Sequence, residues 1–445
     1  MRPPPSQLPA SPTTADRGAM NVLFEGIRIL HPAEGIDGRF FLWLKDGYIE
    51  ALSPEPIAAE PQTHRIDGRT LLAVPGLFDM HVHFREPGQE YKEDIASGTA
   101  AAANGGFTGV CCMPNTEPAL DHPALVHFVR TAPHPAPVDV FCCAALTRGR
   151  LGKELAPLLE LHAAGAVLFS DDGTWLADAE LLRRAFLLLN AVNGLVAQHC
   201  QEPSLTRGFA VNAGAVALRL GLKGYPAVAE EIAIARDLLL ALECDARYHV
   251  QHISTRGAVA LIREAKRRGV RVSCEVTPHH LVLTEEAVGE YDTNAKVNPP
   301  LRTRADVEAL REALAEGIID CIATDHAPHA LHEKLQEFDA APFGIIGLET
   351  AVGVLFTHLI HPGILSLERF VEALALAPRR LLGIPLPEIR PGAGANLTIL
   401  APDEEWRVEP ERFCSKARNT PFAGWELRGK PRWVVNRGCL WECTL

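Results

Sequence analysis

Two histidines at alternate positions, His81 and His83, stand at the end of an apolar stretch of the sequence. Alternate residues of a β-strand share one face, so both imidazoles could bind the same ion. Taken alone, a His-x-His pair also fits two polar residues on an exposed strand edge. The pair indicates a metal site only if further ligands lie at the same place in the fold.

Further possible ligands follow other short apolar stretches. His199, His252 and Asp325 each come where a predicted strand ends, and Asp171 and Asp172 directly follow another. If these strands form a parallel barrel, their carboxyl ends meet at one rim. Several imidazoles and carboxylates placed together there would repel one another unless a cation binds between them, and mixed nitrogen and oxygen ligands favour zinc. The sequence therefore predicts a metal site at this rim.

The elements that would position these residues follow a βαβ pattern between residues 74 and 385. Predicted strands cover residues 77–81, 109–113, 138–145, 166–170, 195–199, 248–253, 270–276 and 318–324. Helical apolar spacing occurs in residues 179–192, 230–241, 258–268 and 305–316. Eight strands fit one closed barrel, so the expected fold is α/β, a (β/α)8 TIM barrel over residues 74–385.

Both ends of the chain have a different character. Residues 1–19 are rich in Pro, Ser and Thr, which predicts a disordered extension, with Met20 as an alternative start. Residues 20–73 and 386–445 carry short alternating apolar stretches broken by Gly and Pro. We expect both ends to build one small β-domain beside the barrel.

Composition narrows the class of partner. The chain has 445 residues, 47% of them hydrophobic and 22% charged, enough for a large core. A formal net charge of -12 leaves no basic stripe for nucleic acid, so a small-molecule substrate is expected.

The eleven cysteines are an odd number and are spread over a long chain, so we expect most of them to be small buried hydrophobic residues. Neither a membrane helix nor a signal peptide is predicted, which leaves the cytoplasm.

Several motifs together resemble class I dihydroorotases of the amidohydrolase superfamily. They run in order along the chain: residues 79–88 (DMHVHFREPG), 113–116 (MPNT), 171–173 (DDG), 252–255 (HIST), 323–329 (ATDHAPH) and 419–422 (NTPF). The resemblance implies an enzyme of de novo pyrimidine (UMP) biosynthesis. Such enzymes reversibly cyclise N-carbamoyl-L-aspartate to L-dihydroorotate.

The resemblance also implies two zinc ions per chain. His81, His83 and Asp325 would bind one ion, His199 and His252 the other, and Asp172 would bridge them. Related hydrolases usually bridge their metals with a carboxylated lysine after the fourth strand, and this chain has no lysine there. An aspartate matches that bridge in charge and reach. The choice of Asp172 over Asp171 depends on the family pattern alone, and Asp171 could orient a loop or a ligand.

Two ions about 3.5 to 4 Å apart can share a water, lower its pKa and polarise the amide carbonyl that it attacks. Asp325 is then the expected acid/base for the leaving nitrogen. Arg85 follows His83 on the same strand-end face, and its guanidinium suits the carboxylate of the substrate. By the family pattern, further substrate contacts are His83, Asn115, Asn298, His329, Phe343 and Gly344. Residues 329–342 could form a mobile cover or an ordinary surface loop.

Two other functions stay open at this point. A dihydropyrimidinase, hydantoinase or allantoinase shares the barrel and the chemistry, but Asp172 and Arg85 argue against it. A non-catalytic scaffold of aspartate transcarbamoylase has lost metal ligands, whereas every expected ligand position is filled in this chain. We expect a homo-oligomer, and an active chain could still form a complex with aspartate transcarbamoylase.

Overall fold

The computed structural model describes residues 20–445. The predicted disordered extension, residues 1–19, lies outside the described residues.

Eight parallel strands form a barrel, as predicted. In chain order they are β6 (Leu77–Val82), β7 (Phe107–Cys112), β8 (Asp139–Ala144), β9 (Leu168–Phe169), β10 (Leu195–Gln198), β13 (Arg247–Val250), β14 (Val272–Val276) and β15 (Cys321–Ile322). Neighbours in this order pair with each other. A parallel bridge between Val82 and His326 joins the two ends of the sheet, with His83 N donating to His326 O at 2.9 Å. The ring is thereby closed.

The barrel strands are buried on both faces because helices cover their outer side. Every residue of β6 and of β7 is buried, which explains their nearly continuous apolar sequence. The last strand, β15, is shorter than predicted. Its ladder stops because Thr324 N donates to the carboxylate of Asp79, at 3.1 Å, instead of to a neighbouring strand. The end of β15 is thus fixed by a side chain.

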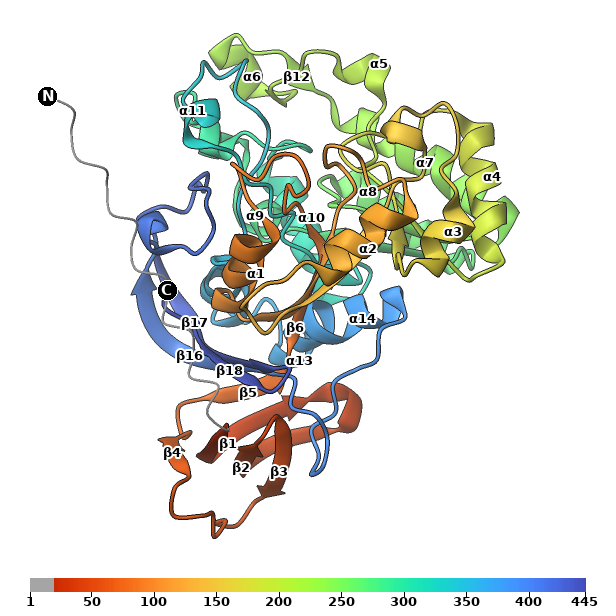
Figure 1. Cartoon of the computed structure of the whole chain (residues 1–445). Coiled ribbons are helices and arrows are strands. Elements are labelled where there is room, and N and C mark those ends of the chain that lie inside the picture. The colour runs from red at the N-terminus through yellow and green to blue at the C-terminus, as the bar shows by residue number, and fades with distance from the viewer. Residues whose placement is uncertain (1–19) are drawn as a thin grey trace, which may run out of the picture.

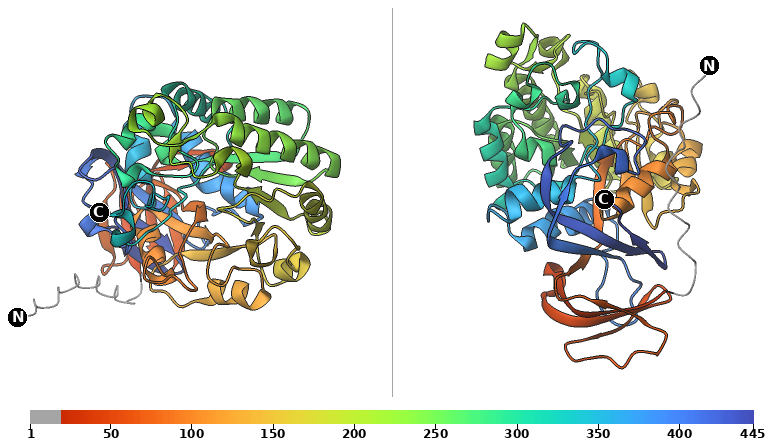
Figure 2. Two further views of the ribbon diagram at one scale, coloured as in Figure 1. Left: turned by 90° about the horizontal axis from the view of Figure 1, so that it is seen from above. Right: turned by 90° about the vertical axis from the view of Figure 1, so that its left-hand side faces the viewer.

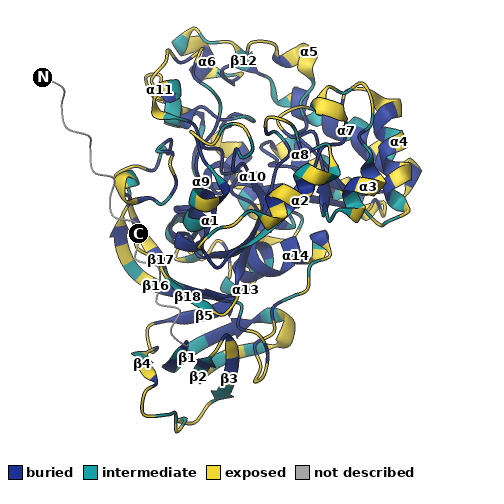
Figure 3. Cartoon of the chain, viewed as in Figure 1, coloured by how far each residue is buried: buried dark blue, intermediate teal, exposed yellow. Residues whose placement is uncertain are grey.

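Helices surround this barrel (Figures 1 and 2). The longer ones are α1 (Ile95–Asn104), α2 (Pro123–Thr131), α4 (Ala179–Asn190), α7 (Ala227–Cys244), α8 (Arg256–Arg267) and α10 (Arg304–Ala315). Shorter ones are α3 (Leu158–Ala163), α5 (Pro203–Thr206), α6 (Ala215–Leu220), α9 (Pro278–Val282), α11 (Leu331–Lys334), α12 (Ala351–Leu355), α13 (Leu367–Val371) and α14 (Ala377–Leu382). The four predicted helices correspond to α4, α7, α8 and α10. Their buried faces pack on the barrel, and their exposed faces point outward (Figure 3).

The two ends of the chain share a second sheet, which runs from the bottom of Figure 1 up its left-hand side. It contains β1 (Asn21–His31), β2 (Ile36–Lys45), β3 (Tyr48–Ser53), β4 (His64–Asp67), β5 (Leu72–Pro75), β16 (Leu397–Arg407), β17 (Glu426–Asn436) and β18 (Cys439–Glu442). Strand β5 pairs parallel with β1 and antiparallel with β16. The prediction that both ends build one β-unit beside the barrel is therefore confirmed. A separate pair, β11 (Val211–Asn212) and β12 (Gly224–Tyr225), lies outside both sheets.

The cysteines behave as the sequence predicts. All eleven are free thiols, and nine of them are buried. Nowhere in residues 20–445 does a helix combine the length and the apolar character needed to cross a bilayer.

Candidate active site

The six predicted metal ligands meet inside the carboxyl-end rim of the barrel. They come from six different places along the chain: His81 in β6, His83 after β6, Asp172 after β9, His199 after β10, His252 after β13 and Asp325 after β15. All six side chains are buried. The convergence of parallel strand ends brings together residues that are up to 244 positions apart.

Asp172 stands between two pairs of histidines. Its Oδ2 lies 3.5 Å from His81 Nε2 and 3.4 Å from His83 Nε2. Its Oδ1 lies 3.7 Å from His252 Nε2 and 3.9 Å from His199 Nδ1. Each carboxylate oxygen therefore serves one pair, which is the arrangement that a bridging ligand needs.

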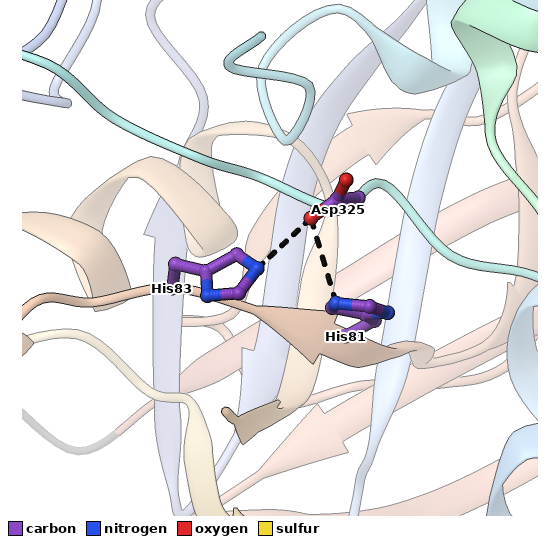
Figure 4. Close-up of side chains that lie close together, drawn as sticks. All are labelled: His81, His83 and Asp325. Carbon is purple, nitrogen blue, oxygen red and sulfur yellow. Dashed lines mark hydrogen bonds and ion pairs between the residues drawn. The ribbon is translucent and has the colours of Figure 1, made fainter. Parts of the chain in front are cut away.

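Asp325 belongs to the first pair. Its Oδ1 lies 2.9 Å from His83 Nε2 and 3.4 Å from His81 Nε2 (Figure 4). His81, His83 and Asp325 thus direct their ligand atoms at one position. A second possible ligand group contains Asp172, His252 and again His81, and His199 Nδ1 lies 3.9 Å from Asp172 beside it.

The remaining nitrogens of three histidines are held by hydrogen-bond acceptors. His81 Nδ1 lies 2.5 Å from Glu275 Oε1, and His83 Nδ1 lies 2.8 Å from Asn115 Oδ1. His199 Nε2 lies 3.0 Å from Gln201 Oε1. An N–H donated by His81 and by His83 to these acceptors leaves the Nε2 atom of each ring, on the side of Asp172, for a metal ion. The other nitrogen of His199, Nδ1, lies 2.9 Å from His252 Nε2. Metal-binding histidines are oriented by outer partners in this way.

Two buried atoms at this place have no hydrogen-bond partner among the described residues, His81 Nε2 and Asp172 Oδ1. An unpaired buried polar atom is costly unless something else satisfies it. One atom is a lone-pair nitrogen and the other a carboxylate oxygen, so both are satisfied by a cation. The donor set therefore fits bound metal.

The charges of the site agree with this interpretation. Burial alone would lower the pKa of His81, but the carboxylates of Asp172, Glu275 and Asp325 outweigh burial and raise it well above its usual value. Burial would raise the pKa of Asp172, yet the neighbouring imidazoles, His81 first, hold it well below its usual range. Buried carboxylates in such number require positive charge nearby, which metal ions supply.

Three of the predicted site residues have strained backbones. Positive φ angles occur at Arg85 (60°), Asp325 (49°) and His252 (28°). Such conformations are uncommon for residues other than glycine and cost about 1–3 kcal/mol each. All three residues lie at the carboxyl-end rim, directly after barrel strands or close behind them.

Glu275 is a functional residue that the sequence reasoning missed. It lies in β14, is buried, and binds His81 through one oxygen and His249 Nε2, at 3.2 Å, through the other. Burial opposes its ionisation, but the two histidines lower its pKa to about 2. The available signal was a carboxylate between Cys274 and Val276, near the carboxyl end of a predicted barrel strand.

Replacing Glu275 by glutamine is expected to weaken metal binding by roughly 10- to 100-fold, because the amide no longer orients His81 as an anion does. Competition with a chelator of known affinity measures this directly. Glu349→Gln is the matched control, since Glu349 is equally buried but bonds Asn104 and two backbone amides instead of a histidine. Equal metal affinity in wild type and Glu275→Gln would contradict the assignment.

The predicted substrate contacts line the same rim. Arg85 is buried, and its Nε donates to Pro328 O at 3.2 Å. Asn115 uses Oδ1 to accept from His83, which leaves its amide N–H groups for a ligand. Asn298 lies beside His199 on the rim, with its Nδ2 3.1 Å from His199 Nε2 and 2.9 Å from Gln201 Oε1.

His329 lies at the rim, where its ring is paired with a backbone carbonyl. Its Nε2 lies 2.7 Å from Phe343 O, and since a carbonyl only accepts, the ring must donate there. Burial, followed by the nearby cations Arg85 and Lys334, lowers the pKa of His329 to about 2. The ring is neutral, and its Nδ1 presents a lone pair. In this arrangement His329 offers no proton to a substrate carboxylate.

The segment that carries Phe343 and Gly344 is tied down by two buried ammonium groups. Lys334 Nζ donates to Pro342 O and Gly344 O, at 2.9 and 3.2 Å. Lys296 Nζ donates to Phe338 O and Ala341 O, at 2.6 and 2.7 Å. The expectation of a mobile cover over residues 329–342 stays a prediction.

Comparisons with known proteins agree with this geometry. A family model described as dihydro-orotase-like matches residues 68–258. A dihydroorotase of Pelotomaculum thermopropionicum is 48% identical over 93% of this chain and 96% of that protein. A dihydroorotase of Syntrophus aciditrophicus is 45% identical over 92% of this chain and 96% of its own length. The chain belongs to the dihydroorotase family.

Solved structures place this member of the dihydroorotase family among the barrel amidohydrolases. An L-hydantoinase (dihydropyrimidinase) from Arthrobacter aurescens superposes with a TM-score of 0.82, at 25% identity, covering 95% of this chain and 96% of the other. A dihydropyrimidinase from Brevibacillus agri NCHU1002 superposes with a TM-score of 0.79 at 21% identity, covering 95% of both chains. The second likeness concerns the fold alone.

Proposed function

We propose that this chain is a dihydroorotase, a cyclic amidohydrolase that interconverts N-carbamoyl-L-aspartate and L-dihydroorotate in pyrimidine biosynthesis. The observation that carries the proposal is the position of Asp172 between two histidine pairs, with Asp325 on one side. Identity of 43–48% to curated dihydroorotases supports the same reaction.

The proposed metal complement is two zinc ions. One would be held by His81, His83 and Asp325, the other by His199 and His252, with Asp172 shared between them. Bound zinc would act as a Lewis acid that lowers the pKa of water and polarises the ring amide. The protein contributes the fixed lone pairs, because Glu275, Asn115 and Gln201 hold the opposite ring nitrogens.

Asp325 is the proposed acid/base. In hydrolysis, water adds to the amide carbon, the C–N bond of the ring breaks, and the leaving nitrogen needs one proton. A carboxylate beside the attacking water can take its proton and deliver it to that nitrogen. His81 and His83 lower the pKa of Asp325, overcoming its burial, so it starts the cycle ionised and ready to accept. In the cyclisation direction Asp325 removes the proton of the ureido nitrogen.

Arg85 and Asn115 are the proposed anchors of the substrate carboxylate. The Arg85 guanidinium is buried beside the metal ligands, where a fixed cation binds a carboxylate strongly. The free amide of Asn115 adds a donor on the same side. Asn298, His329 and the backbone of Phe343 and Gly344 are proposed as further contacts, and His329 would have to exchange its Phe343 partner in order to donate.

The decisive experiment measures dihydroorotate hydrolysis and carbamoyl-aspartate cyclisation by the purified protein, with its metal content determined on the same sample. We expect both reactions, about two zinc ions per chain, and loss of activity after chelation that added zinc restores. Dihydrouracil, hydantoin and allantoin serve as comparison substrates. Preference for one of them would favour a dihydropyrimidinase, hydantoinase or allantoinase. No turnover in a fully metallated sample would favour a scaffold of aspartate transcarbamoylase.

Several finer predictions go with this proposal. They are a cytoplasmic homo-oligomer, a possible complex with aspartate transcarbamoylase, and a division of the chain at residues 20–73, 74–385 and 386–445. Gel filtration with light scattering of the protein alone measures its oligomeric state. The same measurement with aspartate transcarbamoylase added tests for the complex.

A further inference from the structure

A segment of the C-terminal part of the chain lies against the rim of the barrel. Residues 413–422, called the strap below, connect β16 to β17 and rise beside the barrel in Figure 1. Opposite them lie residues 324–346, called the rim loop, which follow β15 and carry Asp325, His329, Phe343 and Gly344. The strap belongs to neither the metal ligands nor the substrate contacts described above.

Asn419 of the strap bonds both arms of the rim loop. Its Oδ1 accepts from His329 N at 3.1 Å, and its Nδ2 donates to Ala327 O and to Gly344 O, each at 3.0 Å. Its backbone O accepts from Ile346 N at 3.0 Å. The side chain is 2% exposed, so water does not substitute for these bonds. The two arms also bond each other directly, through Ala327 N to Ile345 O at 3.0 Å and His329 Nε2 to Phe343 O at 2.7 Å, and the amide of Asn419 ties both of them to the strap.

The two arms approach each other too closely to tolerate a side chain between them. Gly344 has a φ of +150°, and a Cβ there would lie 2.8 Å from Ala327 O and from the ring of His329. Only glycine fits such a distance. The arms therefore need a fixed spacing, and the amide of Asn419, which bonds Ala327 O and Gly344 O at once, fixes the position of this closely spaced pair relative to the strap.

The strap is itself anchored to the barrel, so Asn419 has a defined position. Glu349 accepts from Cys414 N at 2.7 Å and from Ser415 N at 3.2 Å. Glu93 accepts from Ser415 Oγ at 2.5 Å and from Lys416 N at 3.2 Å. Both carboxylates are buried. Buried carboxylates that accept backbone N–H groups hold a segment rigidly.

The root of the rim loop is held independently of the strap. Thr324 N donates to Asp79, and the Val82–His326 bridge continues the barrel past Asp325. Loss of the side-chain contacts of Asn419 would therefore leave Asp325 in place and let the outer residues, 327–329 and 343–344, shift relative to it.

We propose that Asn419 is a positioning residue which, from the C-terminal strap, fixes the substrate-facing arms of the rim loop and so controls how tightly the carboxylated ring is bound. The identity of that ring depends on the proposed function, whereas the restraint on the rim loop does not.

Asn419→Asp tests the proposal with almost no change of shape. Aspartate keeps the acceptor for His329 N but places an oxygen in front of Ala327 O and Gly344 O, where the amide donates. We expect KM for dihydroorotate to rise by about 10- to 100-fold, because small displacements of binding groups have effects of this size. The turnover number should stay within about threefold, and zinc content should not change.

The matched control is Asn436→Asp. Asn436 is also a buried asparagine of the C-terminal strands, and its Nδ2 donates to Thr108 O and Asp139 Oδ2 at the base of the barrel. This variant should lose stability without a change of KM. If Asn419→Asp only lowers the melting temperature, or lowers kcat at constant KM, the proposal is wrong.

Amide hydrogen exchange gives a readout that needs no substrate. In Asn419→Ala, which removes all three side-chain bonds, the amide of His329 loses its acceptor and should exchange at least about tenfold faster, while that of His83 in the barrel bridge should not. Unchanged exchange would overturn the proposal. If the wild type does not hydrolyse dihydroorotate, the proposed function fails, and the exchange data alone decide the role of Asn419.

Discussion

Asp172→Asn is expected to reduce kcat/KM for dihydroorotate by about 10³-fold or more and to release at least one zinc ion per chain. Asp172 faces four imidazoles with its two oxygens, and the amide removes the charge and one of the two acceptors. Metal ions contribute several kcal/mol to such reactions, and each 1.36 kcal/mol corresponds to about a factor of ten. Steady-state kinetics and elemental analysis of one sample measure both effects.

Asp171→Asn provides the control for this substitution. The neighbouring carboxylate is also buried, but it accepts from Thr147 N at 3.0 Å and from Thr147 Oγ1, and within residues 20–445 it forms no ion pair with a histidine. We expect this variant to lose stability and to keep both its zinc and most of its activity. Loss of zinc from Asp171→Asn but not from Asp172→Asn would exchange the roles of the two aspartates.

The different directions of Asp171 and Asp172 show where sequence reasoning stops. Successive residues at a strand end point to opposite sides, so one carboxylate must enter the rim and the other must leave it. Which one enters depends on the register of β9, and that strand has only two residues, Leu168 and Phe169. Without the family resemblance, residue pattern alone could not choose between them.

The positions of the ligands, in contrast, follow from the sequence. Each ligand ends an apolar run, and parallel strands in a barrel must deliver their carboxyl ends to one rim. The outer partners do not follow in this way. Glu275 meets His81 across 194 residues, and Asn419 meets Gly344 across 75, through side-chain geometry that no local pattern encodes.

The ring orientation of His329 also depends on tertiary contacts and not on a local sequence pattern. Its spacing in residues 323–329 predicts a place at the rim, which the chain does provide. The proton on its Nε2 is fixed by Phe343 O, 14 residues later, and that contact depends on how the rim loop returns. Protonation and ring orientation are tertiary properties, and sequence motifs do not determine them.

Arg85→Met is expected to raise KM for dihydroorotate by about 100-fold with a smaller change of kcat. Two charge-assisted hydrogen bonds to a carboxylate contribute about 3 kcal/mol together, and methionine retains the apolar stem while removing both. The left-handed backbone at Arg85, with φ of 60°, directs the guanidinium toward the rim, so its loss should affect binding first. Steady-state kinetics in both directions measure the change.

Two further variants serve as controls: Arg379→Met for the loss of a buried guanidinium elsewhere, and Arg85→Lys for the positive charge alone. Arg379 is an equally buried guanidinium, but it donates to Gly76 O and Ala375 O at the base of the barrel, so its replacement should affect stability alone. Lysine at position 85 keeps the charge without the two-pronged geometry and should recover only part of the affinity. If Arg85→Met left KM unchanged, the carboxylate would have to be bound elsewhere. The free amide of Asn115 would then be the next group to replace, because it is the remaining donor beside His83.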